Sequence, residues 1–107
     1  MSEEPAWIAV AAVDDVAPGA TLEVVAGDAI VALANVDGEI YALDGICAHQ
    51  GGPLGKGKLV GCTLTCPWHG WQYDVTTGRQ MLSDTIRQSR YQLRIERDTI
   101  LVRLSDV

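Results

Sequence analysis

The sequence has few cysteines, no long apolar run and no sign of a targeting segment. Three cysteines cannot form the even-numbered disulfide framework of a small secreted domain, which points to a reducing compartment. The apolar runs, residues 30–34 among them, are all far too short to cross a bilayer. Residues 1–6 lack the basic region and apolar region of a secretory signal. We therefore expect a soluble, cytoplasmic protein that does not bind membranes.

Positive charge is absent from the first half of the chain. Residues 1–55 contain nine acidic residues and no Lys or Arg, whereas residues 56–107 hold all eight basic residues beside five acidic ones. The net charge is −6. Because phosphate contacts need Lys and Arg, this balance argues against nucleic-acid or anionic-membrane binding. The acidic half fits either a face kept charged for solubility or a surface that steers a basic protein partner.

Helical periodicity is also missing, since no window keeps it for more than two turns. Instead, short segments rich in Val, Ile, Leu and Thr alternate with Gly and Asp, and Asp37-Gly38 is the strongest hairpin signal. At 107 residues and 48% hydrophobic content, one domain can bury a modest core. We predict an all-β fold with strands over residues 7–13, 21–25, 29–36, 39–43, 91–96 and 99–104.

The middle of the chain differs in composition, because Gly, Pro, Cys, His and Trp are dense between Gly45 and Gly78. Strands there can only be short. We interpret this stretch as an insertion that carries the chemistry on a scaffold made from both ends. The prediction is a single domain over residues 1–107, with a base over 1–44 and 80–107 and an inserted subdomain over 45–79.

Both histidines of the chain lie in this insertion, each close to a cysteine. The pairs are Cys47-Ala48-His49 and Cys66-Pro67-Trp68-His69, with sixteen residues between them. Thiolate and imidazole together suit zinc, copper or iron–sulfur. Gly51-Gly52-Pro53 predicts a sharp turn after the first pair, and Gly70 predicts a close backbone approach after the second. The predicted metal ligands are Cys47, His49, Cys66 and His69.

Two other interpretations of these residues stay open at this point. The cysteines and histidines could be incidental core residues, although both pairs lie in Gly-rich loops and the chain has no other histidine. A tetrahedral structural zinc with two Cys and two His is the stronger alternative. Zinc fingers keep their cysteines together and precede a helix, which fits poorly with mixed pairs in a β context.

The order Cys-x-His, a sixteen-residue spacer and Cys-x-x-His resembles the Rieske family. The resemblance is specific over C-A-H-Q-G-G-P-L and C-P-W-H-G-W-Q-Y-D-V-T-T-G. It implies an antiparallel β base barrel or sandwich with a cluster-binding subdomain, and one [2Fe–2S] cluster per chain. It places Cys47 and Cys66 on one iron and His49 and His69 on the other. Histidine ligation raises the reduction potential above that of all-cysteine clusters.

The resemblance also suggests what surrounds the cluster. Tyr73 matches the family's tyrosine near a cysteine sulfur, whereas Trp71 replaces a serine that hydrogen-bonds the cluster in quinol-oxidising members. Gly52 and Trp68 replace the two disulfide cysteines of those members. Without the serine, we expect a potential near the low end of the family's range. The residues expected around the cluster or facing a partner are Gln50, Gly51, Pro53, Leu54, Pro67, Trp68, Trp71 and Tyr73.

Three features lie outside the motif. We expect Cys62 to be a small buried side chain in the strand that enters the second loop. Trp7 is expected to pack in the core or on an edge strand. No proline follows Pro67, so residues 81–90 must cover the cluster differently from the proline-containing loop of many relatives, or leave it more exposed.

The resemblance implies a stand-alone ferredoxin that passes single electrons from a flavin-dependent NAD(P)H reductase to a terminal oxygenase. Such a protein is not itself an enzyme and has no small-molecule substrate of its own. No histidine follows His69, so the chain cannot build the mononuclear iron site of an oxygenase α subunit. The first alternative is the small Rieske subunit of an NAD(P)H nitrite reductase. An alternative of another class is a zinc-bound or disused structural domain.

Overall fold

The computed structural model describes residues 6–48, 51–68, 70–83 and 85–106. Within these ranges, no helix is long and apolar enough to cross a membrane. The same ranges form strands β1 (Ile8–Ala12), β2 (Thr21–Ala26), β3 (Ala29–Val36), β4 (Glu39–Asp44), β5 (Lys58–Val60), β6 (Thr63–Thr65), β7 (Gln72–Asp74), β8 (Arg90–Glu96) and β9 (Thr99–Asp106), with short 3-10 helices η1 (Val13–Asp15) and η2 (Leu54–Lys56).

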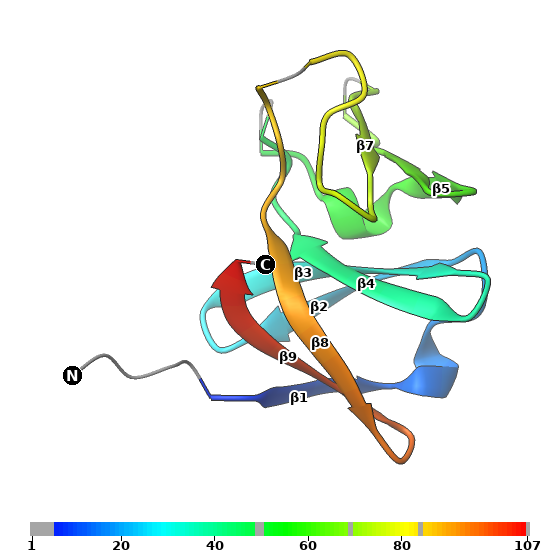
Figure 1. Cartoon of the computed structure of the whole chain (residues 1–107), viewed down its shortest axis with the longest axis vertical. Coiled ribbons are helices and arrows are strands. Elements are labelled where there is room, and N and C mark those ends of the chain that lie inside the picture. Colours follow the sequence, from blue (N-terminus) through cyan, green and yellow to red (C-terminus); the bar gives the residue numbers. More distant parts are fainter. Residues whose placement is uncertain (1–5, 49–50, 69, 84, 107) are drawn as a thin grey trace.

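The larger sheet joins both ends of the chain, in the order β1-β9-β8-β4-β3-β2 (Figure 1). Every pairing in it is antiparallel. The sheet curls so that its edge strands approach, and Ile8 Cδ1 lies 3.9 Å from where a Cβ on Gly27 would stand. Asp37 and Gly38 both have positive φ, as a type I′ hairpin turn requires. The predicted all-β fold and this hairpin are confirmed, with strand ends shifted by one or two residues.

Strand β3 is buried on both of its faces. One face contributes to the interior of the curled sheet, and the other carries the inserted segment. Val31 and Leu33 point into the interior of the curled sheet with Ile100 and Val102. The alternate residues Ala32 and Ala34 face outward. There they join a second core with side chains from the inserted segment, namely Leu54, Leu64, Tyr73 and Val75. Small alanines at these positions let the insertion pack closely on the sheet.

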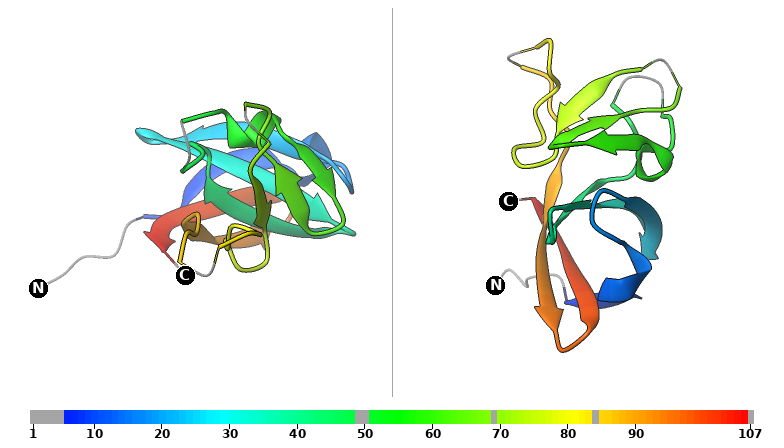
Figure 2. Two further views of the ribbon diagram at one scale, coloured as in Figure 1. Left: turned by 90° about the horizontal axis from the view of Figure 1, so that it is seen from above. Right: turned by 90° about the vertical axis from the view of Figure 1, so that its right-hand side faces the viewer.

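The insertion forms a smaller antiparallel sheet, β5-β6-β7, which sits over one end of the larger sheet (Figure 2). Helix η2 lies at the junction, where a Cβ on Gly55 would stand 2.9 Å from Glu23 Cα. Thr21 Oγ1 donates a hydrogen bond to the Gly57 carbonyl at 3.0 Å. Close backbone packing and this bond therefore hold the small sheet on β2.

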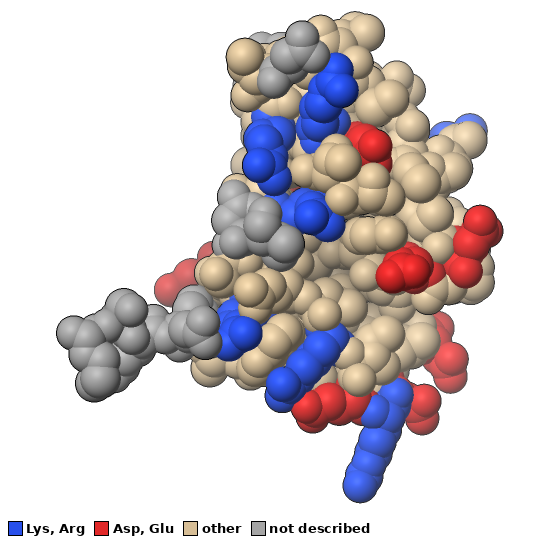
Figure 3. Space-filling view, in the orientation of Figure 1, with Lys and Arg blue, Asp and Glu red and all other residues tan. Residues whose placement is uncertain are grey.

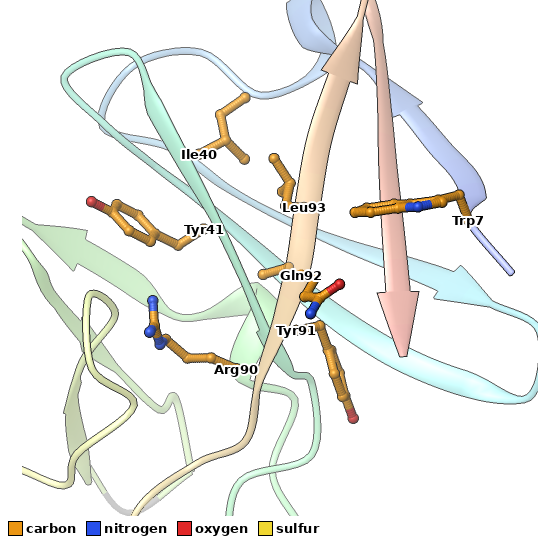
Figure 4. A pocket seen from close by; sticks show the side chains of 8 residues that line it. Trp7, Ile40, Tyr41, Arg90, Tyr91, Gln92 and Leu93 are labelled. Atoms are coloured by element: carbon orange, nitrogen blue, oxygen red, sulfur yellow. The ribbon is translucent and has the colours of Figure 1, made fainter. Parts of the chain in front are cut away.

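Strands β4 and β8 separate after a short paired stretch. They pair at Ala42–Tyr91 and Leu43–Arg90, and beyond these pairs a cavity of about 430 Å³ opens between them (Figure 4). Of the predicted ligand and cluster-facing residues that the structure describes, none lines this cavity. The lining residues are Trp7, Ile40, Tyr41, Ala42, Arg90, Tyr91, Gln92 and Leu93.

Trp7 precedes β1, the edge strand of the larger sheet, and packs against two arginines. Its ring centroid lies 4.5 Å from Arg94 Cζ and 4.6 Å from Arg103 Cζ. Stacking of guanidinium groups on an indole face is favourable, because the ring quadrupole attracts cations. The prediction of edge-strand packing for Trp7 is confirmed.

Cys62 does not occupy the buried strand position expected from the sequence. It is exposed, in the turn Gly61-Cys62 between β5 and β6. Gly61 has φ +59, a conformation that glycine adopts without strain and that lets the hairpin reverse at this point. The prediction was wrong because β6, the strand that enters the second loop, begins at Thr63, so Cys62 lies in the turn one residue before it.

Candidate metal centre

Cys47 and Cys66 begin two loops with the same backbone pattern. The Cys47 N–H donates to the Gly52 carbonyl at 2.9 Å, and the Gly51 N–H donates back to the Cys47 carbonyl at 3.0 Å. In the second loop, Cys66 bonds in the same way with Trp71 at 2.8 Å and with Gly70 at 3.2 Å. Each loop thus presents its cysteine at the same point of a closed turn.

Glycine is needed at the same position of each loop for conformational reasons. Gly51 has φ +77 and Gly70 has φ +76, in the left-handed region that other residues adopt at a cost. The sharp turn expected at Gly51 is therefore confirmed. Beyond its chain neighbours, no atom of the described residues lies within 4 Å of where a Cβ on Gly70 would stand, and the close backbone approach expected there stays a prediction. Its positive φ by itself favours glycine at this position.

The two thiols lie at the bottom of these loops and are shielded from solvent. Cys47 and Cys66 are each 3% exposed and share one core with Leu43, Leu54 and Leu64. Burial raises the pKa of the Cys66 thiol, and its contact with Cys47 raises it further, while a hydrogen bond with the Trp68 backbone opposes the rise. Two cysteines from separate loops thus meet in an apolar site that suits soft metal ligation.

Tyr73 reaches this site from β7 and contacts one of the thiols. Its side chain is fully buried, and its Oη lies 3.2 Å from Cys47 Sγ. Burial raises the pKa of the Tyr73 phenol well above its usual range, with a further rise from Cys47. The phenol therefore stays protonated at neutral pH and can donate its hydrogen bond to the Cys47 sulfur. This agrees with the resemblance to the Rieske family, which places a tyrosine at this position near a cysteine sulfur.

The two positions that carry disulfide cysteines in quinol-oxidising Rieske proteins are neighbours in space. A Cβ on Gly52 would lie 3.0 Å from Trp68 Cβ and 2.7 Å from Cys66 Sγ. The indole of Trp68 thus packs against Gly52 where a covalent bridge would otherwise join the loops. Any side chain at residue 52 would displace either the indole or the sulfur.

The other predicted site residues fall into three groups. Leu54 is buried beneath the loops, Trp71 packs partly buried against the same core, and Pro53 pairs with Ile46. Gly51, Pro67 and Trp68 are exposed, with Trp68 at 52%. Three of the predicted residues lie outside the described part of the chain, namely His49, Gln50 and His69.

Two residues beside the site were missed by the sequence analysis. Ile46 is 49% exposed next to Cys47, and its Cγ2 lies 3.8 Å from where a Cβ on Gly51 would stand. Gln88, from the segment before β8, hydrogen-bonds the backbone on both sides of Cys47. A lone glutamine nineteen positions after the last ligand carries no sequence signal, so only the structure identifies it.

Charge is distributed unevenly over the face shown in Figure 3. Lys and Arg side chains lie at the upper left and again toward the bottom of this face, with an acidic side chain beside the upper group, whereas most Asp and Glu lie toward the right and lower edges (Figure 3). The segment between β7 and β8 contains Arg79 and Arg87. This face therefore carries no uniform charge of either sign.

Thiol reactivity checks this description of the three cysteines. In the folded protein, we expect a thiol reagent such as 5,5′-dithiobis(2-nitrobenzoate) to modify Cys62 rapidly, because Cys62 is exposed and the other two are buried. One equivalent should react quickly and three should react in denaturant. Rapid reaction of two or three thiols in the folded protein would contradict the burial of Cys47 and Cys66.

The residues present fit an iron–sulfur group. Two buried thiols converge from two loops, a protonated phenol faces one sulfur, and Gly52 keeps the space beside Cys66 Sγ free. Thiolates are the ligands that hold such clusters, and a bound metal removes the proton that burial otherwise favours on the sulfur. The donor chemistry of this end of the molecule therefore agrees with the motif.

Comparisons with known proteins agree with the geometry. The profile of the Rieske [2Fe-2S] domain family matches residues 6–92. The ferredoxin component of the naphthalene 1,2-dioxygenase system of Pseudomonas putida is 33% identical over 100 residues, covering 92% of this chain and 96% of the relative.

Solved structures give the same result. A chain from the complex of reduced oxygenase and oxidized ferredoxin in carbazole 1,9a-dioxygenase matches with a TM-score of 0.85 and 28% identity, over 94% of this chain and 95% of that one. The terminal oxygenase of carbazole 1,9a-dioxygenase from Nocardioides aromaticivorans IC177 matches with a TM-score of 0.84 and 27% identity, over 97% of this chain but 31% of that one. The chain belongs to the Rieske [2Fe-2S] domain family.

Proposed function

We propose that this protein is a one-electron carrier that holds one [2Fe–2S] cluster through Cys47, His49, Cys66 and His69. In this proposal, residues 1–44 and 80–107 form the base and residues 45–79 bind the cluster. The observation that carries it is the pair of buried thiols presented by two equivalent loops, with Tyr73 on one sulfur. A bound cluster of this type takes up and releases one electron at a time.

The chain's own residues give the site two distinct sides. On the inner side, Leu43, Leu54 and Leu64 exclude water from the sulfurs, and Tyr73 directs a proton donor at Cys47. On the outer side, the exposed Ile46 and Trp68 present apolar surface at the same end of the molecule. A small apolar surface suits brief docking, because electron-transfer interfaces are small and transient.

The partners we propose are a flavin-dependent NAD(P)H reductase as electron donor and a terminal oxygenase as acceptor. Support comes from the naphthalene dioxygenase relative, which is named as a ferredoxin component and has nearly the same length as this chain. The matched carbazole dioxygenase complex pairs a ferredoxin with an oxygenase. These relatives favour a ferredoxin over a nitrite reductase subunit, and the family match argues against a structural zinc domain. A cytoplasmic location fits three cysteines that are all free.

An EPR-monitored redox titration of the purified protein tests the proposal. We expect a rhombic signal in the reduced state only, and a midpoint near the low end of the Rieske range, about −150 mV. A midpoint several hundred millivolts higher would point to a quinol-type partner instead. A colourless, zinc-containing protein without a signal would refute the electron-carrier proposal.

A further inference from the structure

Gln88 lies between the small sheet and β8 and is almost completely buried, at 2% exposure. Its side-chain amide makes three hydrogen bonds to backbone on another segment. Nε2 donates to the Asp44 carbonyl at 2.8 Å and also to the Ile46 carbonyl. Oε1 accepts from the Ala48 N–H at 3.1 Å. Both amide hydrogens and the oxygen are thus used on the chain entering and leaving Cys47.

These three bonds hold the backbone on both sides of a proposed ligand. Ile46 and Ala48 are the immediate neighbours of Cys47, so the position of its Cα depends on where their peptide groups are fixed. Only a side chain with two donors and an acceptor in one plane can satisfy all three groups, and Gln supplies this set. An apolar residue of the same size would leave three backbone groups without this partner.

The backbone held by Gln88 also lies beside the groups that contact the Cys47 sulfur. The Ala48 backbone N–H that bonds Gln88 Oε1 also interacts with the Tyr73 phenol, where it opposes the rise in the phenol's pKa. Tyr73 in turn lies 3.2 Å from Cys47 Sγ. A movement of residues 46–48 would therefore change both the position of Cys47 and its hydrogen bond from Tyr73.

Gln88 is itself anchored to the chain that closes the second loop. Its N–H donates to the Gly78 carbonyl at 2.6 Å. Gly78 has φ +83, and a Cβ there would stand 2.3 Å from the Gln88 carbonyl oxygen. The two backbones are therefore in contact, and the Gln88 side chain extends from this anchored position to the first loop.

We propose that Gln88 is a positioning residue that fixes the Cys47 loop relative to the second loop. This inference rests on the proposed function, because it needs Cys47 to hold iron. It concerns how the first loop is held, and it does not require Gln88 to contact the cluster.

The test compares Gln88→Leu with a matched control, Gln80→Leu. Gln80 is also a buried glutamine of this segment, at 5% exposure, but its Oε1 accepts from Leu82 N within its own turn. In Gln88→Leu we expect a chelator to remove iron at least about tenfold faster than from the native protein. The reduced-state EPR signal should also broaden and shift in g. In Gln80→Leu both should match the native protein.

A general structural role would lower the unfolding temperature of both variants without moving the EPR signal. Equal iron-release rates and identical g values in Gln88→Leu and Gln80→Leu would therefore overturn the inference. If Gln88→Leu does not fold, Gln88→Glu keeps the acceptor for Ala48 and loses the paired amide donors. Its second carboxylate oxygen would face the Asp44 and Ile46 carbonyls, which are acceptors as well. It should therefore also release iron faster than the native protein, and native behaviour of Gln88→Glu would equally overturn the inference.

The role of Gln88 in holding the Cys47 loop can also be examined without iron, which separates the two proposals. In cluster-free protein, Cys47 should react with a thiol reagent faster in Gln88→Leu than in the native chain, while Cys66 changes less. Native protein without any cluster would refute the proposed function. Native protein with a cluster, but with Gln88 variants that behave like it, would refute only the role of Gln88.

Discussion

Replacing Cys66 with serine is expected to abolish cluster binding, with iron content and visible absorbance falling to below about a tenth of the native values. Iron–sulfur clusters are held by thiolates, and a hydroxyl cannot be deprotonated at neutral pH to replace one. Cys66 is buried among apolar side chains, so no exposed group can move in to take its place. The measurements are iron analysis and the visible spectrum of the purified variant.

Cys62→Ser is the matched control for this experiment. The chemical change is the same, but Cys62 lies exposed in the β5–β6 turn, four positions before Cys66. We expect native iron content, an unchanged spectrum and an unchanged unfolding temperature. A Cys66→Ser protein that keeps its iron, or a Cys62→Ser protein that loses it, would show that the wrong cysteine had been assigned.

The base of the fold was predictable because its signals are local. Strands over 29–36 and 39–43 follow from alternating apolar residues around Asp37-Gly38, and the hairpin forms there with positive φ at both turn residues. The last hairpin follows in the same way, with its turn at Arg97-Asp98. At both hairpins the alternation of apolar residues and the turn residues indicate the same structure, so residues close in sequence are enough to predict it.

The arrangement around the cysteines could be predicted only in part. The motif identifies Cys47 and Cys66, because their spacing and flanking glycines are unusual. It does not show that Trp68 packs on Gly52, since that contact joins loops that are separate in sequence. The role of Gln88 is even harder to predict from the sequence, because an isolated glutamine has no periodicity or spacing that distinguishes it. The burial predicted for Cys62 was wrong for a smaller reason, because β6 begins one residue after it and leaves it in the turn.

The charge distribution changes how the acidic sequence is to be understood. On the face in Figure 3, basic side chains lie at the upper left and again toward the bottom, and acidic ones lie mainly toward the right and lower edges. Steering by a uniformly acidic docking surface therefore finds no support on this face. The acidic residues there fit the alternative interpretation, a charged surface that maintains solubility.

Tyr73→Phe is expected to lower the reduction potential by about 50 mV. A hydrogen bond to a charged acceptor contributes about 1.5–3 kcal/mol, and about 59 mV corresponds to a tenfold change for one electron. The bond exists in both redox states, so only its strengthening on reduction changes the potential, and the expected shift lies below the value that the whole bond would give. Because the reduced state is the more negative one, a donor at Cys47 Sγ stabilises it, and removal of that donor lowers the potential.

The same variant tests the protonation of the phenol. Burial raises the pKa of Tyr73 well above its usual range, so the phenol donates throughout the neutral range and the shift should not depend on pH there. Tyr91→Phe is the control, since Tyr91 lies beside the cavity between β4 and β8, away from the cysteines, and its potential should stay native. An unchanged potential in Tyr73→Phe would mean that the 3.2 Å contact with Cys47 Sγ does not act on the electron-transfer site. An equal shift in Tyr91→Phe would assign the effect to the loss of any tyrosine hydroxyl and would contradict a specific role of Tyr73.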